Sequence, residues 1–303
     1  MCLTLGLAGC GGGTAPTAPL ATLPGPTATP ASEPTAAIAT VLPTATPVPT
    51  LPTGTFTLAA NVWWSGFKIA ITGGDYDASK HTLTIDASFT NTGTESWELR
   101  QLSAETTLAW NGKSLPGFET SGIVAGGATA ASRIQFAVPA GFDLSQAVLT
   151  FGKADEFQAT VPLDGSRVDF EGPGTFTLAG KVTMGKFVTY TVTKALILQA
   201  SCSGYPQRLK YGPLKKGLVS LVIFGTAASK DSTNYRQIDA GYLTLEGNRV
   251  DSVPAMGLSL PLSVSVPNVA MCFTLPFSGA GDFTLRMHEY RSNATGSLVF
   301  QLQ

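Results

Sequence analysis

The residues of this chain that could carry catalysis are few and scattered. The two histidines, His81 and His288, lie in no recognisable catalytic motif. The run Asp75 to Ser79 has alternating side-chain oxygens like the start of a calcium loop, but Lys80 stands where such a loop has glycine and Asp86 where it has glutamate. No nucleophile elbow, phosphate loop, dinucleotide fingerprint or paired-cysteine metal pattern occurs. We expect a polar turn at Asp75 to Ser79 and no enzyme activity, cofactor or metal site; a hydrolase built from scattered carboxylates is the alternative.

A processing signal stands at the N-terminus. Residues 3–9 are an apolar run closed by small residues, as in an export signal that is removed from the mature protein. Leu7-Ala8-Gly9-Cys10 resembles the lipobox of bacterial lipoproteins, and this resemblance implies that Cys10 carries diacylglycerol and that the chain is cut just before it. Residues 1–9 lack the Lys or Arg with which such a signal begins, so we expect the start codon to lie upstream. A chance match in a disordered tail is the alternative.

The next segment, residues 11–53, has the composition of a stalk. Thr14 to Thr53 holds ten prolines, eleven threonines and nine alanines, with Glu33 as its only charge. Such a segment buries too little apolar area to offset chain entropy, and its prolines favour extended polyproline II. We expect a disordered linker, which at about 3.1 Å per residue reaches roughly 100 Å when extended.

The rest of the chain is one module used twice. Gly54 to Ala59 is repeated without change at Gly174 to Ala179. Four further segments align at larger offsets: Leu83–Phe89 with Leu218–Phe224, Leu108–Gly112 with Leu243–Gly247, Phe136–Pro139 with Phe273–Pro276, and Val148–Thr150 with Phe283–Leu285. We therefore expect one domain at residues 54–165 and a second at residues 166–303, with an insertion in the second copy near Cys202.

Both copies have the pattern of short strands. Apolar and polar residues alternate from Leu83 to Phe89, the period of a half-buried strand, and Asn111-Gly112 is typical of a hairpin turn. The prediction is an all-β protein with two tandem antiparallel β-sandwiches after the linker. The pattern, with a strand that ends in Asn91-Thr92-Gly93, resembles the immunoglobulin-like sandwich domains of unknown function in exported bacterial lipoproteins.

Two cysteines remain in the region expected to fold. Cys2 lies in the expected signal and Cys10 is the expected acyl acceptor, which leaves Cys202 and Cys272. Outside the cytosol such a pair predicts a disulfide, with two buried free thiols as the alternative. True immunoglobulin domains place a Trp between their cysteines and a Tyr two residues before the second. The second copy has no such Trp and has Ala270 at the Tyr position, so it departs from that family.

Charge is distributed unevenly between the copies. Residues 54–165 carry six Lys/Arg against eleven Asp/Glu, and residues 166–303 carry thirteen against eight, so we expect a weak attraction between them. The insertion gathers basic and aromatic residues: Tyr205, Arg208, Lys210, Tyr211, Lys215 and Lys216. This segment is a candidate surface for anionic lipid, a wall polymer or an acidic partner. A solvated hairpin is the alternative.

Trp63 completes the candidate binding surface. Strand alternation points Trp64 inward and Trp63 outward, whereas the second copy has Thr183 at the outward position. An exposed indole at Trp63 would stack on a sugar or anchor a partner. The alternative is that a neighbouring loop or the other domain covers it.

Composition excludes two further classes of function. A formal charge of -1 argues against nucleic-acid binding, and the longest apolar stretch, Leu218 to Ala228, is too short for a membrane-spanning helix. We expect an extracytoplasmic bacterial lipoprotein, held to the membrane by its N-terminal lipid, that acts as a non-enzymatic binding module for an envelope protein or polysaccharide. A carbohydrate-binding surface protein and a structural subunit of a membrane-associated complex are the alternatives.

Overall fold

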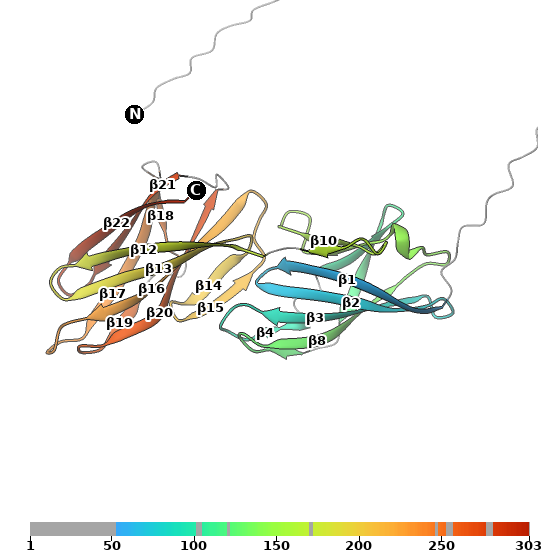
Figure 1. Ribbon diagram of the computed structural model, residues 1–303, viewed down its shortest axis with the longest axis horizontal. Coiled ribbons are helices and arrows are strands. Elements are labelled where there is room, and N and C mark those ends of the chain that lie inside the picture. The colour runs from blue at the N-terminus through green and yellow to red at the C-terminus, as the bar shows by residue number, and fades with distance from the viewer. Residues whose placement is uncertain are drawn as a thin grey trace, which may run out of the picture. The chain divides into compact units, whose positions relative to one another are not determined.

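The computed structural model describes residues 53–100, 105–119, 122–169, 172–245, 248–252, 257–276 and 281–302. The predicted signal, with Cys10, and the linker as far as residue 52 lie outside the described residues. Regular structure in the described part is nearly all β-strand (Figure 1), with a short 3-10 helix at Leu144–Gln146. The all-β prediction is confirmed.

The main sheet of the first copy has nine strands, and two short strands at residues 97–98 and 123–124 pair beside it. In spatial order its strands are β10 (Ala159–Pro162), β9 (Val148–Phe151), β5 (Thr106–Trp110), β6 (Lys113–Glu119), β8 (Thr129–Ala137), β3 (Thr82–Asn91), β2 (Phe67–Asp77), β1 (Gly54–Trp64) and β11 (Val168–Asp169). Strands β6 and β8 pair with Gly117 opposite Phe136, and a Cβ at Gly117 would lie only 3.0 Å from the Ile134 and Phe136 side chains. Because glycine permits this approach, the expected two sheets are joined into one barrel-like sheet. Strand β11 lies past the predicted boundary at residue 165 and still belongs to this sheet.

The second copy is a β-sandwich. One sheet contains β12 (Gly174–Met184), β13 (Val188–Leu198), β16 (Leu218–Ser229) and β20 (Ser265–Pro276). The other contains β18 (Asn248–Asp251), β17 (Arg236–Leu245), β21 (Gly281–Glu289) and β22 (Ala294–Leu302), with β19 (Leu258–Leu260) beside β17. Side chains of both sheets, among them Tyr190, Leu221, Leu243 and Leu285, form one buried core between them.

Strand order and register show how the copies correspond. The order β1-β2-β3-β8 in the first copy is matched by β12-β13-β16-β20 in the second. Leu83 pairs with Phe136, and Leu221 pairs with Phe273, so Leu221 occupies the position of Leu83. The sequence alignment of Leu83–Phe89 with Leu218–Phe224 is therefore wrong by three residues.

The cause of that error is burial on both faces of β16. Leu221 and Ile223 enter the sandwich core, while Val222 joins a second apolar cluster on the opposite face. A strand that is apolar on both faces loses the alternation from which register is inferred.

The inserted segment covers that opposite face. It forms a two-stranded hairpin, β14 (Ser201–Tyr205) and β15 (Arg208–Gly212). Cys202 of β14 and Cys272 of β20 form the predicted disulfide, with Cα atoms 6.0 Å apart. The hairpin is thereby attached covalently to the four-stranded sheet.

Tyr190 provides a test of the second core. Its side chain is fully buried, and its single hydroxyl proton is donated to the carbonyl oxygen of Val269 (2.9 Å), with the carbonyl oxygen of Ile223 as a second, more distant acceptor (3.2 Å). Tyr190→Phe removes this donor, so we expect the free energy of unfolding to fall by about 1 to 3 kcal/mol in urea titrations. The control Tyr242→Phe alters a half-buried ring that stacks on Arg249 and should change stability by less than about 0.5 kcal/mol. Equal effects of the two variants would contradict the assignment.

Candidate functional site

Trp63, the expected exposed anchor, is buried. Only 6% of its surface is accessible, and its indole lies in an apolar cluster with residues of the hairpin and of the sheet beneath it. The other members of this cluster all belong to the second copy: Leu198, Ala200, Cys202, Leu209, Tyr211, Val222, Ala270 and Cys272. The prediction of an accessible indole is wrong, and the alternative, coverage by the other domain, is what the structure has. Tyr211 is also buried, so it too is no part of an open surface.

The hairpin is hydrogen-bonded to the loop that follows β3. The Leu209 N–H donates to the Thr94 hydroxyl oxygen (2.6 Å), and the N–H groups of Thr94 and Glu95 both donate to the Leu209 carbonyl oxygen (2.9 and 3.2 Å). Asn91 shapes this loop, because its side-chain oxygen accepts from Gly93 N–H (2.9 Å) and its amide donates to the Glu95 carbonyl (2.7 Å). The Asn-Thr-Gly motif thus positions the backbone that receives the hairpin.

Two glycines allow the close approach of the first copy to the hairpin. Gly66, in the turn between β1 and β2, has a φ of +88°, and a Cβ there would lie 2.4 Å from the Cβ of Tyr211. A Cβ at Gly93 would lie 2.9 Å from the Leu209 carbonyl oxygen. Enclosure of the Tyr211 ring raises the pKa of its hydroxyl to about 12. The glycines, the indole and this ring form a closely fitted contact.

The segment between β15 and β16 extends the contact. The Phe157 N–H donates to the Leu214 carbonyl oxygen (2.9 Å), and the Lys216 N–H donates to the Asp155 carbonyl oxygen (3.0 Å). Lys215 forms an isolated β-bridge with Glu156. Lys215 and Lys216 are therefore attached to the first copy through their backbone, while their side chains remain exposed.

The basic side chains of the hairpin face acidic and aromatic groups of the first copy. Arg208 Nε lies 3.8 Å from Glu95 Oε1, and Lys210 Nζ lies 3.7 Å from the centroid of the Trp97 ring. The Arg208–Glu95 pair is largely exposed and of modest strength, whereas Lys210 and Trp97 are both half-buried. The backbone of Tyr205 pairs with Arg208 in the hairpin, and its side chain lies outside the described part of the chain. Of the candidate residues, Trp63 and Tyr211 are buried in the contact between the copies, and Arg208 and Lys210 lie beside it. The side chains of Lys215 and Lys216 stay exposed.

Residues considered for catalysis or metal binding take part in local turns. Asp77 Oδ1 accepts hydrogen bonds from the N–H groups of Ser79 (3.0 Å) and Lys80 (3.1 Å), which is the predicted polar turn. His288 lies between Asn293 and Asp239, with ring nitrogens 2.8 and 2.6 Å from their oxygens, and these hydrogen bonds raise its pKa. Within the described ranges no group of three or more His, Cys, Asp or Glu side chains could hold a metal ion.

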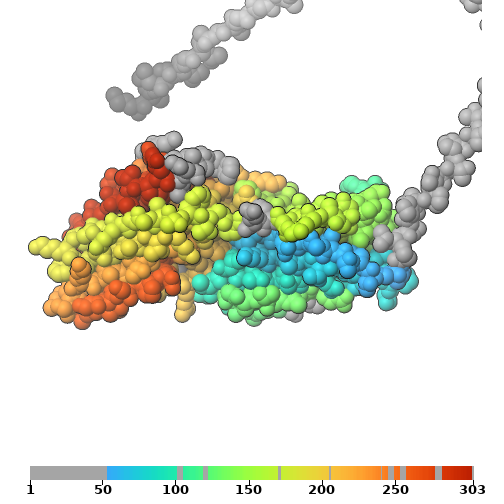
Figure 2. Space-filling model, in the orientation of Figure 1, coloured from blue at the N-terminus to red at the C-terminus, as the bar shows by residue number. Residues whose placement is uncertain are grey.

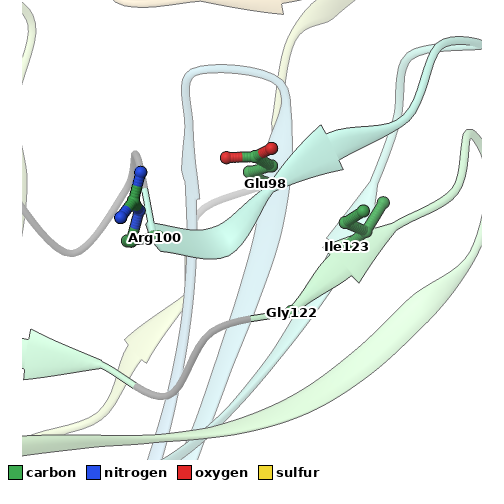
Figure 3. A pocket seen from close by; sticks show the side chains of 4 residues that line it. All are labelled: Glu98, Arg100, Gly122 and Ile123. Carbon is green, nitrogen blue, oxygen red and sulfur yellow. The ribbon is translucent and has the colours of Figure 1, made fainter.

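A surface pocket of about 420 Å³ lies beside the short strands β4 (Trp97–Glu98) and β7 (Ile123–Val124). Figure 3 shows Glu98, Arg100 and Ile123 around it, and Ile123 is 70% exposed. Sequence analysis did not single out these residues, because no motif contains them. The described lining supplies a carboxylate, a guanidinium and an apolar side chain.

No protein-family model matches the chain, and no curated protein matches it. Among solved structures, a conserved domain protein from Bacillus anthracis matches with 10% sequence identity, covering 82% of this chain and 90% of that one, at a TM-score of 0.23. A likeness at that TM-score carries no argument about fold or function. Across the described residues, no helix is both long and apolar enough to pass through a bilayer.

The junction can be tested through Trp63. Trp63→Ala leaves a cavity between the copies, and we expect a loss of about 3 to 5 kcal/mol together with uncoupled unfolding of the two copies. Scanning calorimetry should show one transition for the wild-type chain and two for the variant. Phe118→Ala, at an exposed position of β6, is the control and should keep one transition. A single unshifted transition in Trp63→Ala would refute the coupling.

The disulfide gives a second prediction. The cysteines are 70 residues apart, and a loop of that size contributes roughly 4 kcal/mol in the chain-entropy model. Replacing both Cys202 and Cys272 by alanine should lower the stability of the second copy by up to this amount in guanidinium titrations. Mass spectrometry of the non-reduced protein should show the crosslinked peptide, and alkylation of both thiols without reductant would rule the bond out.

Proposed function

We propose that this chain is an extracytoplasmic bacterial lipoprotein, anchored by a lipid on Cys10, whose two tandem immunoglobulin-like copies act as a non-enzymatic binding module for another envelope component. The Leu7-Ala8-Gly9-Cys10 motif and the Pro/Thr/Ala-rich segment support the address. The repeated strand order supports the tandem copies.

The Cys202–Cys272 disulfide is the observation that carries the proposal. Disulfides persist in oxidising compartments and are rare in the cytosol, so the bond fits a protein exported from the cell interior. The junction supports a binding role, because it joins the two copies through a buried cluster and backbone hydrogen bonds. A module that presents surfaces at fixed positions to a partner needs such a connection.

The sugar-binding hypothesis loses its main support. It depended on an exposed indole at Trp63, and that indole is covered by the hairpin. We therefore favour an envelope protein as the partner. A role as a structural subunit of a membrane-associated complex remains an outcome of the test.

The anchor is tested with the natural gene, including its upstream region, expressed in bacteria fed an alkyne fatty acid. We expect the wild-type protein to carry the label and to sediment with membranes. Cys10→Ser should lose the label, while Cys2→Ser, in the expected signal, should keep it as the wild type does. A label that survives Cys10→Ser would exclude lipidation at this position.

The binding role is tested by mild-detergent purification of the acylated protein after crosslinking in intact cells. A partner that is captured repeatedly and released by salt supports the binding module. A partner retained in fixed stoichiometry through gel filtration indicates the structural subunit instead. Hydrolysis of envelope substrates by the purified chain would overturn the non-enzymatic assignment.

A further inference from the structure

One end of the second copy gathers exposed apolar side chains that sequence analysis did not single out. Four loops meet there: residues 185–187 between β12 and β13, 230–235 between β16 and β17, 261–264 between β19 and β20, and 290–293 between β21 and β22 (Figure 1). Tyr235 and Tyr290 are 51% and 65% exposed, and Phe187, Leu262 and Val264 are also exposed. In Figure 2 the yellow and orange loop ends lie at the left edge of the molecule. We call these four loops the aromatic end.

Backbone hydrogen bonds hold the four loops side by side. The Lys230 N–H donates to the Phe187 carbonyl oxygen (2.8 Å), and the Ser229 N–H donates to the Val264 carbonyl oxygen (3.0 Å). The Tyr290 N–H donates to the Gln237 carbonyl oxygen (3.0 Å). The exposed side chains therefore belong to one continuous surface.

A buried ion-pair network forms the base of the aromatic end. Arg236 Nη2 lies 2.6 Å and its Nε 2.8 Å from Asp231 Oδ2, and its Nη1 lies 3.6 Å from Glu289 Oε2. Asp231 also accepts from the Thr233 N–H (2.9 Å), and Glu289 accepts from the Ser292 N–H (2.8 Å). Both carboxylates are buried, and each accepts hydrogen bonds from backbone N–H groups of its own loop. These bonds fix the backbone of the two loops.

The same network leaves the surface of the aromatic end positively charged. Its two carboxylates are buried, whereas Lys186, Lys230 and Arg291 are exposed. Arg291 also stacks on the Tyr235 ring, with its Cζ 4.6 Å from the ring centroid. The described loops thus present tyrosine, phenylalanine and aliphatic side chains among basic groups, with no exposed carboxylate.

We propose that the aromatic end docks on an anionic lipid surface. Tyrosine rings suit the headgroup level of a bilayer, and lysine and arginine there meet lipid phosphates. Lys186, Lys230 and Arg291 stand among the described loops without an exposed carboxylate, so the charge of the aromatic end complements the phosphates of an anionic lipid surface. The contact goes beyond the anchor proposed at Cys10, because it brings the folded part of the chain itself to a membrane.

The test uses the full chain with Cys10→Ser, which carries no acyl group, and sedimentation with vesicles. Binding is expected to phosphatidylcholine vesicles that contain phosphatidylglycerol, to be weak to phosphatidylcholine alone, and to fall as salt rises. Adding Lys186→Glu and Lys230→Glu should lower the partition coefficient by about tenfold or more. Adding Tyr235→Ser and Tyr290→Ser should also lower it, and the effect should persist at high salt.

Val299→Ser and Phe118→Ser are matched controls, because both alter exposed apolar side chains outside the aromatic end. They should bind vesicles as the parent chain does, and all variants should keep its melting temperature. The proposal fails if the parent chain ignores anionic vesicles, or if the controls lose binding as strongly as the loop variants. The same unacylated chain is also added to native membranes before and after protease treatment of those membranes. The proposal fails if the treatment abolishes binding, since the partner would then be a protein. None of these outcomes bears on lipidation at Cys10, which the label test decides separately.

Discussion

The indole of Trp63 is inserted against the hairpin of the second copy, and the arrangement of the candidate site depends on this contact. Without the hairpin, one face of β16 and β20 would be open, and Val222 and Ala270 would be exposed on it. Covering that face requires apolar side chains from β14 and β15, and the indole completes the cluster from the first copy. Burial of a side chain as large as tryptophan is among the strongest single contributions to packing.

The polar contacts around this cluster follow from the same requirement. Backbone groups brought near a buried cluster must find hydrogen-bond partners, and Thr94 and Leu209 satisfy one another across the junction. The basic residues that looked like a free binding surface in the sequence lie at the rim of this contact. Arg208 and Lys210 meet Glu95 and Trp97 there, which is why only part of their charge is available to another molecule.

Sequence analysis predicted the strand content and the disulfide, because alternation and cysteine number are local signals. Of the predicted repeat, the order of four strands is common to both copies. Sequence analysis did not predict that β6 and β8 would join, since that pairing depends on the absence of a side chain at Gly117. It misplaced the register of β16 because both faces of that strand are apolar. It missed the aromatic end because Phe187, Tyr235 and Tyr290 are far apart in the chain and only the fold brings them together.

The placement of the tryptophans has a practical consequence for spectroscopy. All four indoles of the chain belong to the first copy, so the second copy contributes no tryptophan emission of its own. Trp63 and Trp97 nevertheless both touch the hairpin, the former through the apolar cluster and the latter through Lys210. Intrinsic fluorescence is therefore a native reporter of whether the hairpin is seated, without any label having to be introduced.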